Sequence, residues 1–264
     1  MKKILITGKN SYVGNSLAKW LDRYPDSYSI ALISLRDNSW KEKDFSFYDV
    51  VFHVSAVVHQ KEKPVMKELY FKVNSDLPVE VASKAKEAGV SQFIFMSTMA
   101  VYGEEGKLGQ EVVINRDTLV DPKTFYGVSK LEAEAELNKL NDASFRVVVL
   151  RPPMVYGPNC PGNYARLEKL AINLPVFPLI DNKRSMLHID KLCQFVKEYI
   201  DEDAEGLYFP QDDEYVNTSL RVKELAEANG KTLHLSKTIG IVIKLIGKRV
   251  NLINKVFGNL IYEK

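Results

Sequence analysis

Residues 4–14, ILITGKNSYVG, place a short apolar run directly before a turn with a glycine at each end. Gly8 permits a tight turn, and Gly14 lets the following helix pack closely on the strand before it. A middle glycine is usual in such turns, but Ser11 stands there, so an ordinary strand-to-helix turn remains an alternative. Backbone amides at a helix start can face a pyrophosphate. The candidate contacts are therefore Gly8, Asn10, Ser11, Tyr12, Val13 and Gly14.

Apolar runs recur along the first 150 or so residues and alternate with segments of helical period. Strands covered on both faces read as such runs, here Ile4–Ile6, Ile30–Leu35, Val50–Val54, Phe93–Met96 and Val147–Leu150. Helices are predicted at 13–21, 65–88 and 125–140, whereas the short, charged link 36–49 does not favour one. The alternation predicts an α/β fold, a Rossmann-type doubly wound parallel sheet within a first domain at 1–155.

Length and charge narrow the class of protein. The 264 residues suffice for one large domain with a smaller lobe. The 36 Lys and Arg nearly balance 34 Asp and Glu, so there is no general argument for nucleic acid or a membrane surface. Cys160 and Cys193 are too few for a disulfide framework and lack metal-ligand spacing, so no metal is expected and a cytoplasmic location fits best. The apolar start Ile4–Ile6 is too short for a signal peptide.

Tyr126 and Lys130 stand four residues apart, one turn of the predicted helix at 125–140. At this spacing the Lys130 ammonium can favour the Tyr126 phenolate and lower its pKa from about 10. Thr98 follows the apolar run Phe93–Met96, where a strand would end, and its hydroxyl could hold a reacting oxygen. The three residues are candidates for an acid/base centre, although such a Tyr and Lys pair also occurs on ordinary solvated helix faces.

The second strand is predicted to end at Ser34-Leu35-Arg36, beside the ribose of a bound dinucleotide. A hydroxyl and a cation would accept a 2′-phosphate, whereas a carboxylate would repel it. Ser34 and Arg36 therefore favour NADP. Asp37 follows at once and could reach the ribose if the strand were longer, so NAD is the alternative.

Proline-rich sequence follows Arg151 and indicates a smaller substrate-binding lobe at 156–264, which could interleave with the first domain. Helices are expected there near 164–173, 190–200 and 220–229, with a short strand at 207–209. Residues 236–264 combine apolar positions with several cations. A basic amphipathic helix could contact a membrane, but packing on this lobe or on a partner subunit is the favoured interpretation. The apolar run Ile239–Ile246 is too short to cross a bilayer.

Several motifs in order make the chain resemble the extended short-chain dehydrogenase/reductases, in the NAD(P)-dependent epimerase/dehydratase branch that acts on nucleotide sugars. Residues 49–56, DVVFHVSA, resemble the family's third strand, and residues 93–103, FIFMSTMAVYG, its fourth strand and following loop. The glycine turn and the Tyr126/Lys130 pair complete the pattern. The likeness runs almost end to end, although the link 36–49 and the carboxy-terminal lobe are shorter than in larger relatives.

The resemblance implies further site residues. Ala56 lies on the segment that runs along the cofactor, Asn74 matches an asparagine that supports the active site, and Pro153 lies on the segment that leads from the nicotinamide to the substrate. Asn163 and Arg184 match contacts to the substrate diphosphate. Asn163 could instead only cap a helix, and Arg184 could be a surface ion-pair residue. His59 could reach the substrate but is interpreted as a polar loop residue.

The resemblance further implies hydride transfer between NADP (or NAD) and C4 of a nucleotide-linked hexose, most simply a UDP-hexose. The activity is then that of a 4-ketoreductase or a 4-epimerase of surface-polysaccharide sugar biosynthesis. Thr98 and Tyr126 contact the reacting oxygen, and Lys130 holds the nicotinamide ribose. Met99 and Ala100 follow Thr98 where a dehydratase would need carboxyl groups. A non-catalytic NAD(P)-binding sensor or scaffold is the alternative, and a homodimer is the expected assembly.

Overall fold

The computed structural model describes residues 1–58, 62–247 and 250–264, in two compact units. Unit 1 comprises Met1–Gly103, Val120–Pro153 and Ile189–Pro210, and unit 2 comprises Glu104–Leu119, Met154–His188 and Gln211–Lys264. The units therefore interleave along the chain, and residues 189–210 return to unit 1 after the expected boundary at 155. His59, Lys248 and Arg249 lie outside the described residues.

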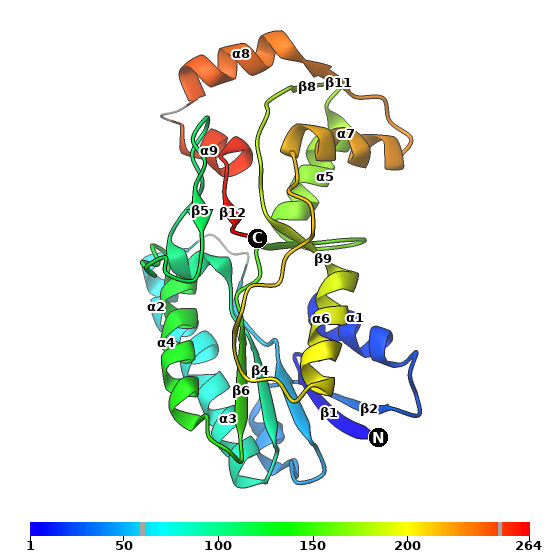
Figure 1. Cartoon of the computed structure of the whole chain (residues 1–264), viewed down its shortest axis with the longest axis vertical. Coiled ribbons are helices and arrows are strands. Elements are labelled where there is room, and N and C mark those ends of the chain that lie inside the picture. Colours follow the sequence, from blue (N-terminus) through cyan, green and yellow to red (C-terminus); the bar gives the residue numbers. More distant parts are fainter. Residues whose placement is uncertain (59–61, 248–249) are drawn as a thin grey trace. The chain divides into compact units, whose positions relative to one another are not determined.

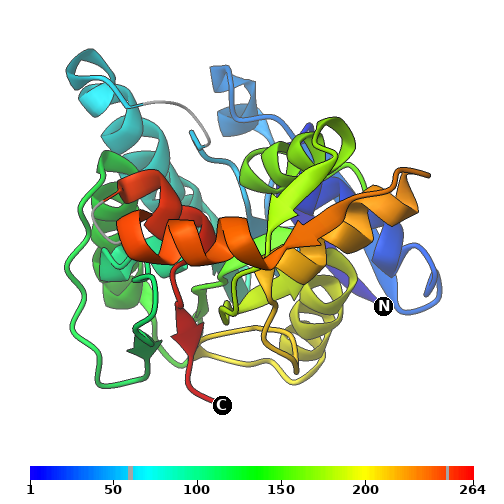
Figure 2. The same cartoon turned by 90° about the horizontal axis from the view of Figure 1, so that it is seen from above.

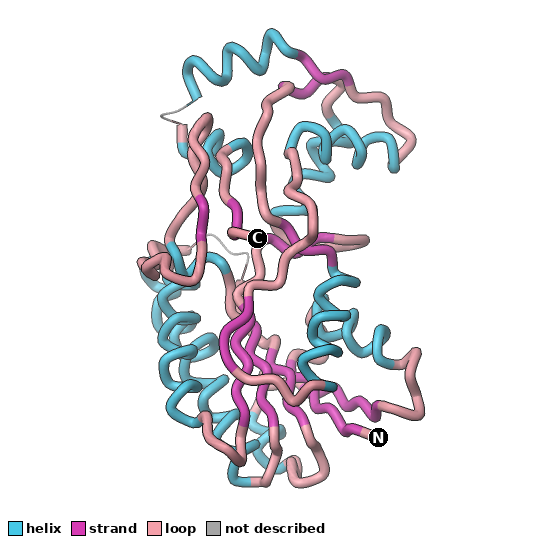
Figure 3. The backbone as a smooth tube through the Cα atoms, viewed as in Figure 1, coloured by secondary structure: helices cyan, strands magenta, loops and turns pink. Residues whose placement is uncertain are grey.

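Unit 1 is built on a six-stranded sheet with the order β10-β6-β4-β3-β1-β2, in which every neighbouring pair is parallel (Figure 3). The chain order reverses between β1 and β3, which defines the switch point of a doubly wound sheet. The predicted Rossmann-type fold is confirmed. The strands are β1 (Lys2–Thr7), β2 (Tyr28–Ile33), β3 (Val50–His53), β4 (Gln92–Met96), β6 (Arg146–Leu150) and β10 (Gly206–Tyr208).

Helices cover both faces of this sheet (Figure 1). On one face α1 (Tyr12–Leu21) packs beside α6 (Ile189–Asp201). On the other face lie α2 (Lys67–Phe71), the π-helical turn η3 (Lys72–Asp76), α3 (Leu77–Glu87) and α4 (Phe125–Leu140). Two short 3-10 helices, η1 (Asn38–Glu42) and η2 (Pro64–Met66), come before α2 in the chain. Apolar side chains of the strands pack with those of α3 and α4 in a buried core that includes Leu5, Phe93, Leu137 and Val149.

All five predicted strands of the first 150 residues are present, because their near-continuous apolar runs match a sheet buried on both faces. The link 36–49 holds only the 3-10 helix η1, in line with its polar composition. The helix expected near 190–200 and the strand expected at 207–209 are also present as α6 and β10. Both belong to unit 1, where β10 extends the sheet by pairing with β6.

Unit 2 contains shorter elements around a second apolar core, which includes Ala171, Phe177, Val222 and Phe257. Its helices are α5 (Asn163–Asn173), α7 (Thr218–Ala228), α8 (Lys237–Ile246) and α9 (Asn251–Phe257). Two-stranded parallel pairs join β5 (Val113–Ile114) to β12 (Ile261–Tyr262), β7 (Met154–Tyr156) to β9 (Met186–His188), and β8 (Val176–Pro178) to β11 (His234–Ser236). Among the described residues, no helix has the length and apolar character that a membrane span requires.

Candidate active site

The turn after β1 has the backbone geometry that a phosphate-binding turn requires. Gly8 adopts φ +81°, which favours glycine. Ser11 caps α1, since its Oγ accepts a hydrogen bond from the Gly14 amide at 3.2 Å. A Cβ on Gly14 would lie 3.1 Å from Ile6 and 3.2 Å from Val54, so this close packing of helix on strand favours glycine. The first turn of α1 carries no acidic residue, and its amides and helix dipole suit a pyrophosphate.

Ser11 therefore compensates for the missing middle glycine by acting as the helix cap. Asn10 is exposed, and Tyr12 and Val13 are half-buried in the first turn of α1. The turn sits at the carboxyl end of β1, beside the switch point between β1 and β3, where doubly wound sheets bind their ligands.

Beyond β2, Ser34 and Arg36 lie close together at the next strand end. The Arg36 amide donates to Ser34 Oγ at 3.3 Å, and the Arg36 side chain is exposed. Asp37 caps η1, where its carboxylate accepts from the Ser39 amide at 2.9 Å and from the Ser39 hydroxyl. These bonds to Ser39 lower the pKa of Asp37. Asp37, which was the alternative contact to the ribose, is thus the N-cap of η1.

The predicted acid/base residues Tyr126 and Thr98 come together in unit 1. Thr98 follows β4 and caps the 3-10 helix η4 (Met99–Tyr102), with its Oγ1 accepting from the Ala100 amide at 3.1 Å. The Thr98 side chain lies close enough to the Tyr126 phenol to act to lower the phenol pKa. Burial outweighs this effect and raises the pKa of Tyr126 to about 12. The phenol therefore holds its proton at neutral pH.

The start of α4 is fixed by capping groups. Thr124 Oγ1 accepts from the Gly127 amide at 3.0 Å. The Glu62 carboxylate accepts from the amides of Phe125 at 2.9 Å and Tyr126 at 3.0 Å, which satisfies two further orphan donors of the first turn. The backbone that carries Tyr126 is consequently held by two side chains before any ligand arrives.

Lys130 is one turn beyond Tyr126, but its ammonium is directed to the sheet. Lys130 Nζ donates to the Met96 carbonyl at 2.8 Å and lies 4.4 Å from the centre of the Phe95 ring. The side chain is buried, and burial lowers the pKa of Lys130 to about 7, against an opposing effect of Glu134. The prediction that Lys130 lowers the pKa of Tyr126 is wrong for this structure, because the phenol is governed by burial and by Thr98.

Asn74 links three segments around the site from the π-helical turn η3. Its Oδ1 accepts from the Val57 amide at 2.8 Å, and its Nδ2 donates to the Val57 carbonyl at 3.0 Å and to Ser129 Oγ at 3.3 Å. Asn74 thus holds the chain next to Ala56, just after β3, against α4. Pro153, which is buried, ends the segment of unit 1 that follows β6.

A buried ion-pair network lies behind Thr98 and was missed in the sequence. Arg151 pairs with Glu134 through contacts of 2.5 to 3.1 Å, and the two side chains are 10% and 5% exposed. Glu134 also accepts from Ser97 Oγ, and Arg151 donates to the Tyr102 hydroxyl at 2.8 Å. The signal was available, because Glu134 lies one further turn beyond Lys130 on the same helix and Arg151 directly follows a buried strand.

Asn163 and Arg184, the two predicted substrate contacts, lie in unit 2. The alternative roles were a helix cap for Asn163 and a surface ion pair for Arg184. Asn163 begins α5, but the N-cap is Gly162, and Asn163 Oδ1 instead accepts from Arg166 at 3.3 Å. Arg184 donates from Nη1 to the carbonyls of Lys255 at 3.1 Å and Gly258 at 2.9 Å. Burial lowers the pKa of Arg184, and no carboxylate of the described residues forms an ion pair with it. Asn163 is therefore not the cap of α5, and Arg184 is not in an ion pair with any described carboxylate.

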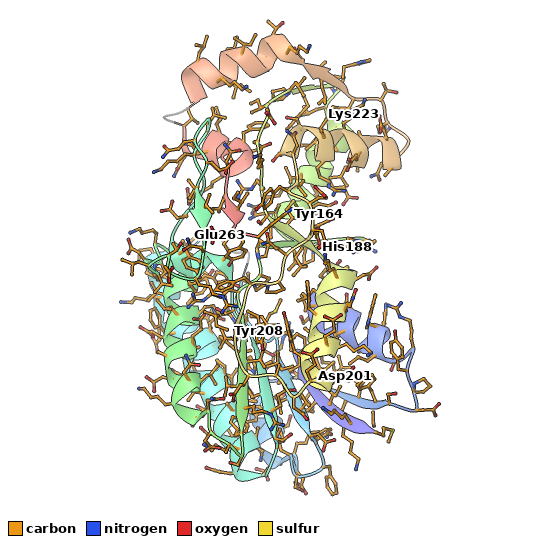
Figure 4. All side chains as sticks on the ribbon, in the orientation of Figure 1. Tyr164, His188, Asp201, Tyr208, Lys223 and Glu263 are labelled. Atoms are coloured by element: carbon orange, nitrogen blue, oxygen red, sulfur yellow. The ribbon has the colours of Figure 1, made fainter. Side chains whose placement is uncertain are left out.

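An aromatic group in unit 2 was not anticipated from the sequence. The Tyr156 ring lies 5.3 Å from that of Tyr164 and 5.1 Å from that of His188, and Figure 4 labels both neighbours within this unit. The Arg221 guanidinium lies 4.8 Å from the centre of the Tyr156 ring. The residues come from four separate segments, so no local spacing could have joined them.

Comparison with known proteins decides the family. The family model described as the NAD dependent epimerase/dehydratase family matches residues 4–207. The chain belongs to this family. The epimerase/dehydratase family match spans all strands of the unit 1 sheet in whole or in part. As a member, the chain is an enzyme that uses NAD or NADP.

Individual relatives agree with this placement. The chain is 32% identical over 286 residues to a UDP-glucose 4-epimerase of Vibrio cholerae, covering 98% of this chain and 86% of the relative. A UDP-glucuronic acid 4-epimerase from Bacillus cereus in complex with NAD shares the fold, with TM-score 0.73, 18% identity and coverage of 99% and 89%. A dTDP-4-dehydrorhamnose reductase from Bacillus anthracis in complex with NADP does so with TM-score 0.70, 18% identity and coverage of 91% and 86%.

Proposed function

We propose that the protein is a nucleotide-sugar oxidoreductase that reduces a keto group at C4 of a UDP-linked hexose. The observation that carries the proposal is the proximity of the Thr98 hydroxyl and the Tyr126 phenol, which affects the phenol pKa, at the carboxyl end of β4 in an epimerase/dehydratase family member. When bound, the dinucleotide supplies the hydride. Tyr126 would then donate its proton to the sugar oxygen while Thr98 holds that oxygen by a hydrogen bond.

The protonation of Tyr126 favours reduction over epimerisation. With a pKa of about 12, the phenol is protonated at neutral pH and ready to act as an acid. An epimerase must also use the phenolate as a base, and burial, which raises the pKa of Tyr126, disfavours that form. A 4-epimerase remains the second candidate because the Vibrio cholerae relative is a UDP-glucose 4-epimerase.

We also propose NADP as the cofactor. Arg36 offers an exposed guanidinium beside the Ser34 hydroxyl, and such a pair suits a 2′-phosphate. The Asp37 carboxylate, which would repel that phosphate, is engaged with Ser39 in the cap of η1. Dissociable NADPH also fits net reduction, whereas an epimerase must retain and recycle its NAD.

Unit 2 is proposed to bind the sugar nucleotide. Arg184 is a half-buried cation whose described partners are neutral backbone carbonyls. Such a group gains from an anionic ligand, and a planar guanidinium suits a diphosphate. Asn163 at the start of α5 would add an amide contact. This assignment supports a nucleotide sugar as the substrate class and leaves the hexose to be identified.

The test is turnover of a 4-keto UDP-hexose, with NADPH oxidation followed by absorbance. Tyr126→Phe removes the proton donor and is expected to lower kcat about 100- to 10,000-fold. Tyr70→Phe is the matched control, since Tyr70 is also buried and influences Tyr126, yet it is given no proton to transfer. Unchanged turnover in Tyr126→Phe would refute the proposed acid.

Product analysis separates the two candidate activities. Stoichiometric NADPH consumption with a 4-hydroxy product supports the reductase. Tightly bound NAD in the purified protein, with interconversion of two UDP-hexoses and no net NADPH oxidation, would establish the epimerase instead. We also propose that the protein is a homodimer, which light scattering tests. We further propose a cytoplasmic location, which cell fractionation tests.

A further inference from the structure

The carboxy-terminal part of unit 2 has an apolar surface that the catalytic proposal does not use. Among large apolar side chains that are exposed, six lie within the fourteen residues of α8, the chain after it and the start of α9. They are Ile239, Ile241, Val242, Leu245, Val250 and Leu252. Scattered exposed apolar residues need no explanation, but a contiguous group marks an interaction surface.

One side of α8 explains how the helix is attached. Gly240 is buried, and a Cβ there would lie 2.1 Å from the Leu179 carbonyl oxygen, so the helix backbone closely approaches the segment after β8. Ile243, three residues on, packs against the apolar core of unit 2. Gly247 is buried one turn further on. Residues three to four apart share a helix face, so this face is fixed as the inner one.

The opposite side of α8 is apolar but uncovered. Ile241, Val242 and Leu245 project from it and are 60%, 49% and 78% exposed. In Figure 1 no described element of unit 2 lies above α8, drawn in orange, and in Figure 2 none lies in front of it. A helix packed only on its own unit would carry polar residues there. The apolar residues are therefore available to another surface.

The charged residues in this stretch of the sequence have a single sign. Between residues 236 and 262 the sequence has five cations, Lys237, Lys244, Lys248, Arg249 and Lys255, and no Asp or Glu, although the whole chain carries 36 basic and 34 acidic residues. Lys255 pairs with Glu105 at 2.9 Å. Lys237 and Lys244, on α8, form no ion pair with any residue that the structure describes. The apolar face is thus bordered by uncompensated positive charge.

We propose that α8 docks the protein on an anionic lipid surface, lying in the plane of the interface with Ile241, Val242 and Leu245 inserted. Apolar residues on one face, flanked by lysines, are the composition of interfacial helices. A second copy of the chain would present the same cations to this face, and their mutual repulsion disfavours it. The helix lies on the membrane and does not cross it, in keeping with the absence of a membrane-spanning helix in the described part of the chain.

This docking would bring unit 2 to the membrane surface, and it does not depend on the proposed activity. Co-sedimentation of the full chain tests it, using phosphatidylcholine vesicles with and without about 30% phosphatidylglycerol. Binding is expected with the anionic vesicles and should weaken as NaCl rises from about 50 mM to about 500 mM, because salt screens the lysines. Leu245→Glu is expected to weaken binding at least about tenfold, by removing an inserted leucine and adding a negative charge.

Matched variants distinguish docking from general stickiness. Leu119→Glu makes the same change at a leucine that is 86% exposed elsewhere in unit 2 and should leave binding unchanged. Lys237→Gln with Lys244→Gln should weaken binding roughly 25-fold, at about fivefold for each lysine. Lys169→Gln with Lys231→Gln, two exposed lysines of the same unit, should have little effect.

Three outcomes would overturn the proposal. The first is absence of binding to anionic vesicles at low salt. The second is binding that survives both Leu245→Glu and the double lysine substitution. The third is a dimer in light scattering that Leu245→Glu dissociates without any vesicle binding, which would assign the face to a second copy. Normal turnover with no vesicle binding would defeat the docking alone and leave the enzymatic proposal standing.

Discussion

Replacing Lys130 by methionine is expected to stabilise the protein while abolishing its activity. Lys130 is buried, and its pKa falls from 10.5 to about 7 on folding. The folded state therefore binds this proton more weakly than the unfolded chain does, which at pH 7 disfavours folding by about 4 kcal/mol. Methionine removes that cost but leaves the Met96 carbonyl without its donor, at about 1–3 kcal/mol. The net gain is about 2 kcal/mol, or roughly 4–8 °C in Tm.

The gain should depend on pH in a defined direction. Below the folded-state pKa of about 7 the cost of the buried lysine is complete, and it fades as pH rises towards 10.5. At about pH 9.5 the cost is only about 1–2 kcal/mol, so the lost Met96 hydrogen bond should cancel the advantage of the variant. Urea unfolding of both proteins at the two pH values measures the difference directly.

Lys139, on the same helix, provides a control for the change in unfolding free energy. Lys139→Met makes the same change at a side chain that is 68% exposed and should alter stability by less than about 0.5 kcal/mol at either pH. A Lys130→Met protein that is less stable than the wild type at pH 7, or that is equally stabilised at both pH values, would show that the ammonium is not held in the environment described.

Three other substitutions test separate parts of the site. Arg36→Glu should raise the KM for NADPH at least about tenfold and affect NADH less, because it places a carboxylate by the 2′-phosphate; equal effects on both would contradict the NADP assignment. Glu134→Gln removes the carboxylate that pairs with the buried Arg151 cation and should destabilise by about 3–5 kcal/mol in urea unfolding, whereas the exposed Glu136→Gln should change little. Gly14→Ala should cost about 1–3 kcal/mol and weaken dinucleotide binding in calorimetry, since its Cβ would crowd Val54; wild-type affinity would refute the close packing.

Much of unit 1 was predictable because its strands are buried on both faces and therefore read as apolar runs. The helix that carries Tyr126 was predicted at 125–140, and α4 has these bounds. The position of β10 was not, because three residues, Gly206–Tyr208, carry no signal for the strand they will join. Pairing of β10 with β6 is a tertiary choice, made where α6 returns the chain to the sheet.

The site was predictable in its membership and less so in its electrostatics. Spacing alone placed Lys130 near Tyr126, but it could not show that the ammonium would reach the Met96 carbonyl or that burial would dominate the phenol pKa. Desolvation depends on the whole surrounding fold and not on the distance between two residues in a helix. The positions of Glu134 on the helix and of Arg151 after a buried strand could be read from the sequence, but their pairing joins two different elements and needed the fold.

The π-helical turn at Lys72–Asp76 carries a consequence for chain length. A π turn holds one more residue than an α turn, and here it aims Asn74 at both Val57 and Ser129. Loss of a single codon in this stretch would restore a regular helix and rotate the following residues by about 100°. Homologous chains should therefore tolerate substitutions here more readily than deletions. A relative with a one-residue gap at this place should lack the contacts that Asn74 makes with Val57 and Ser129.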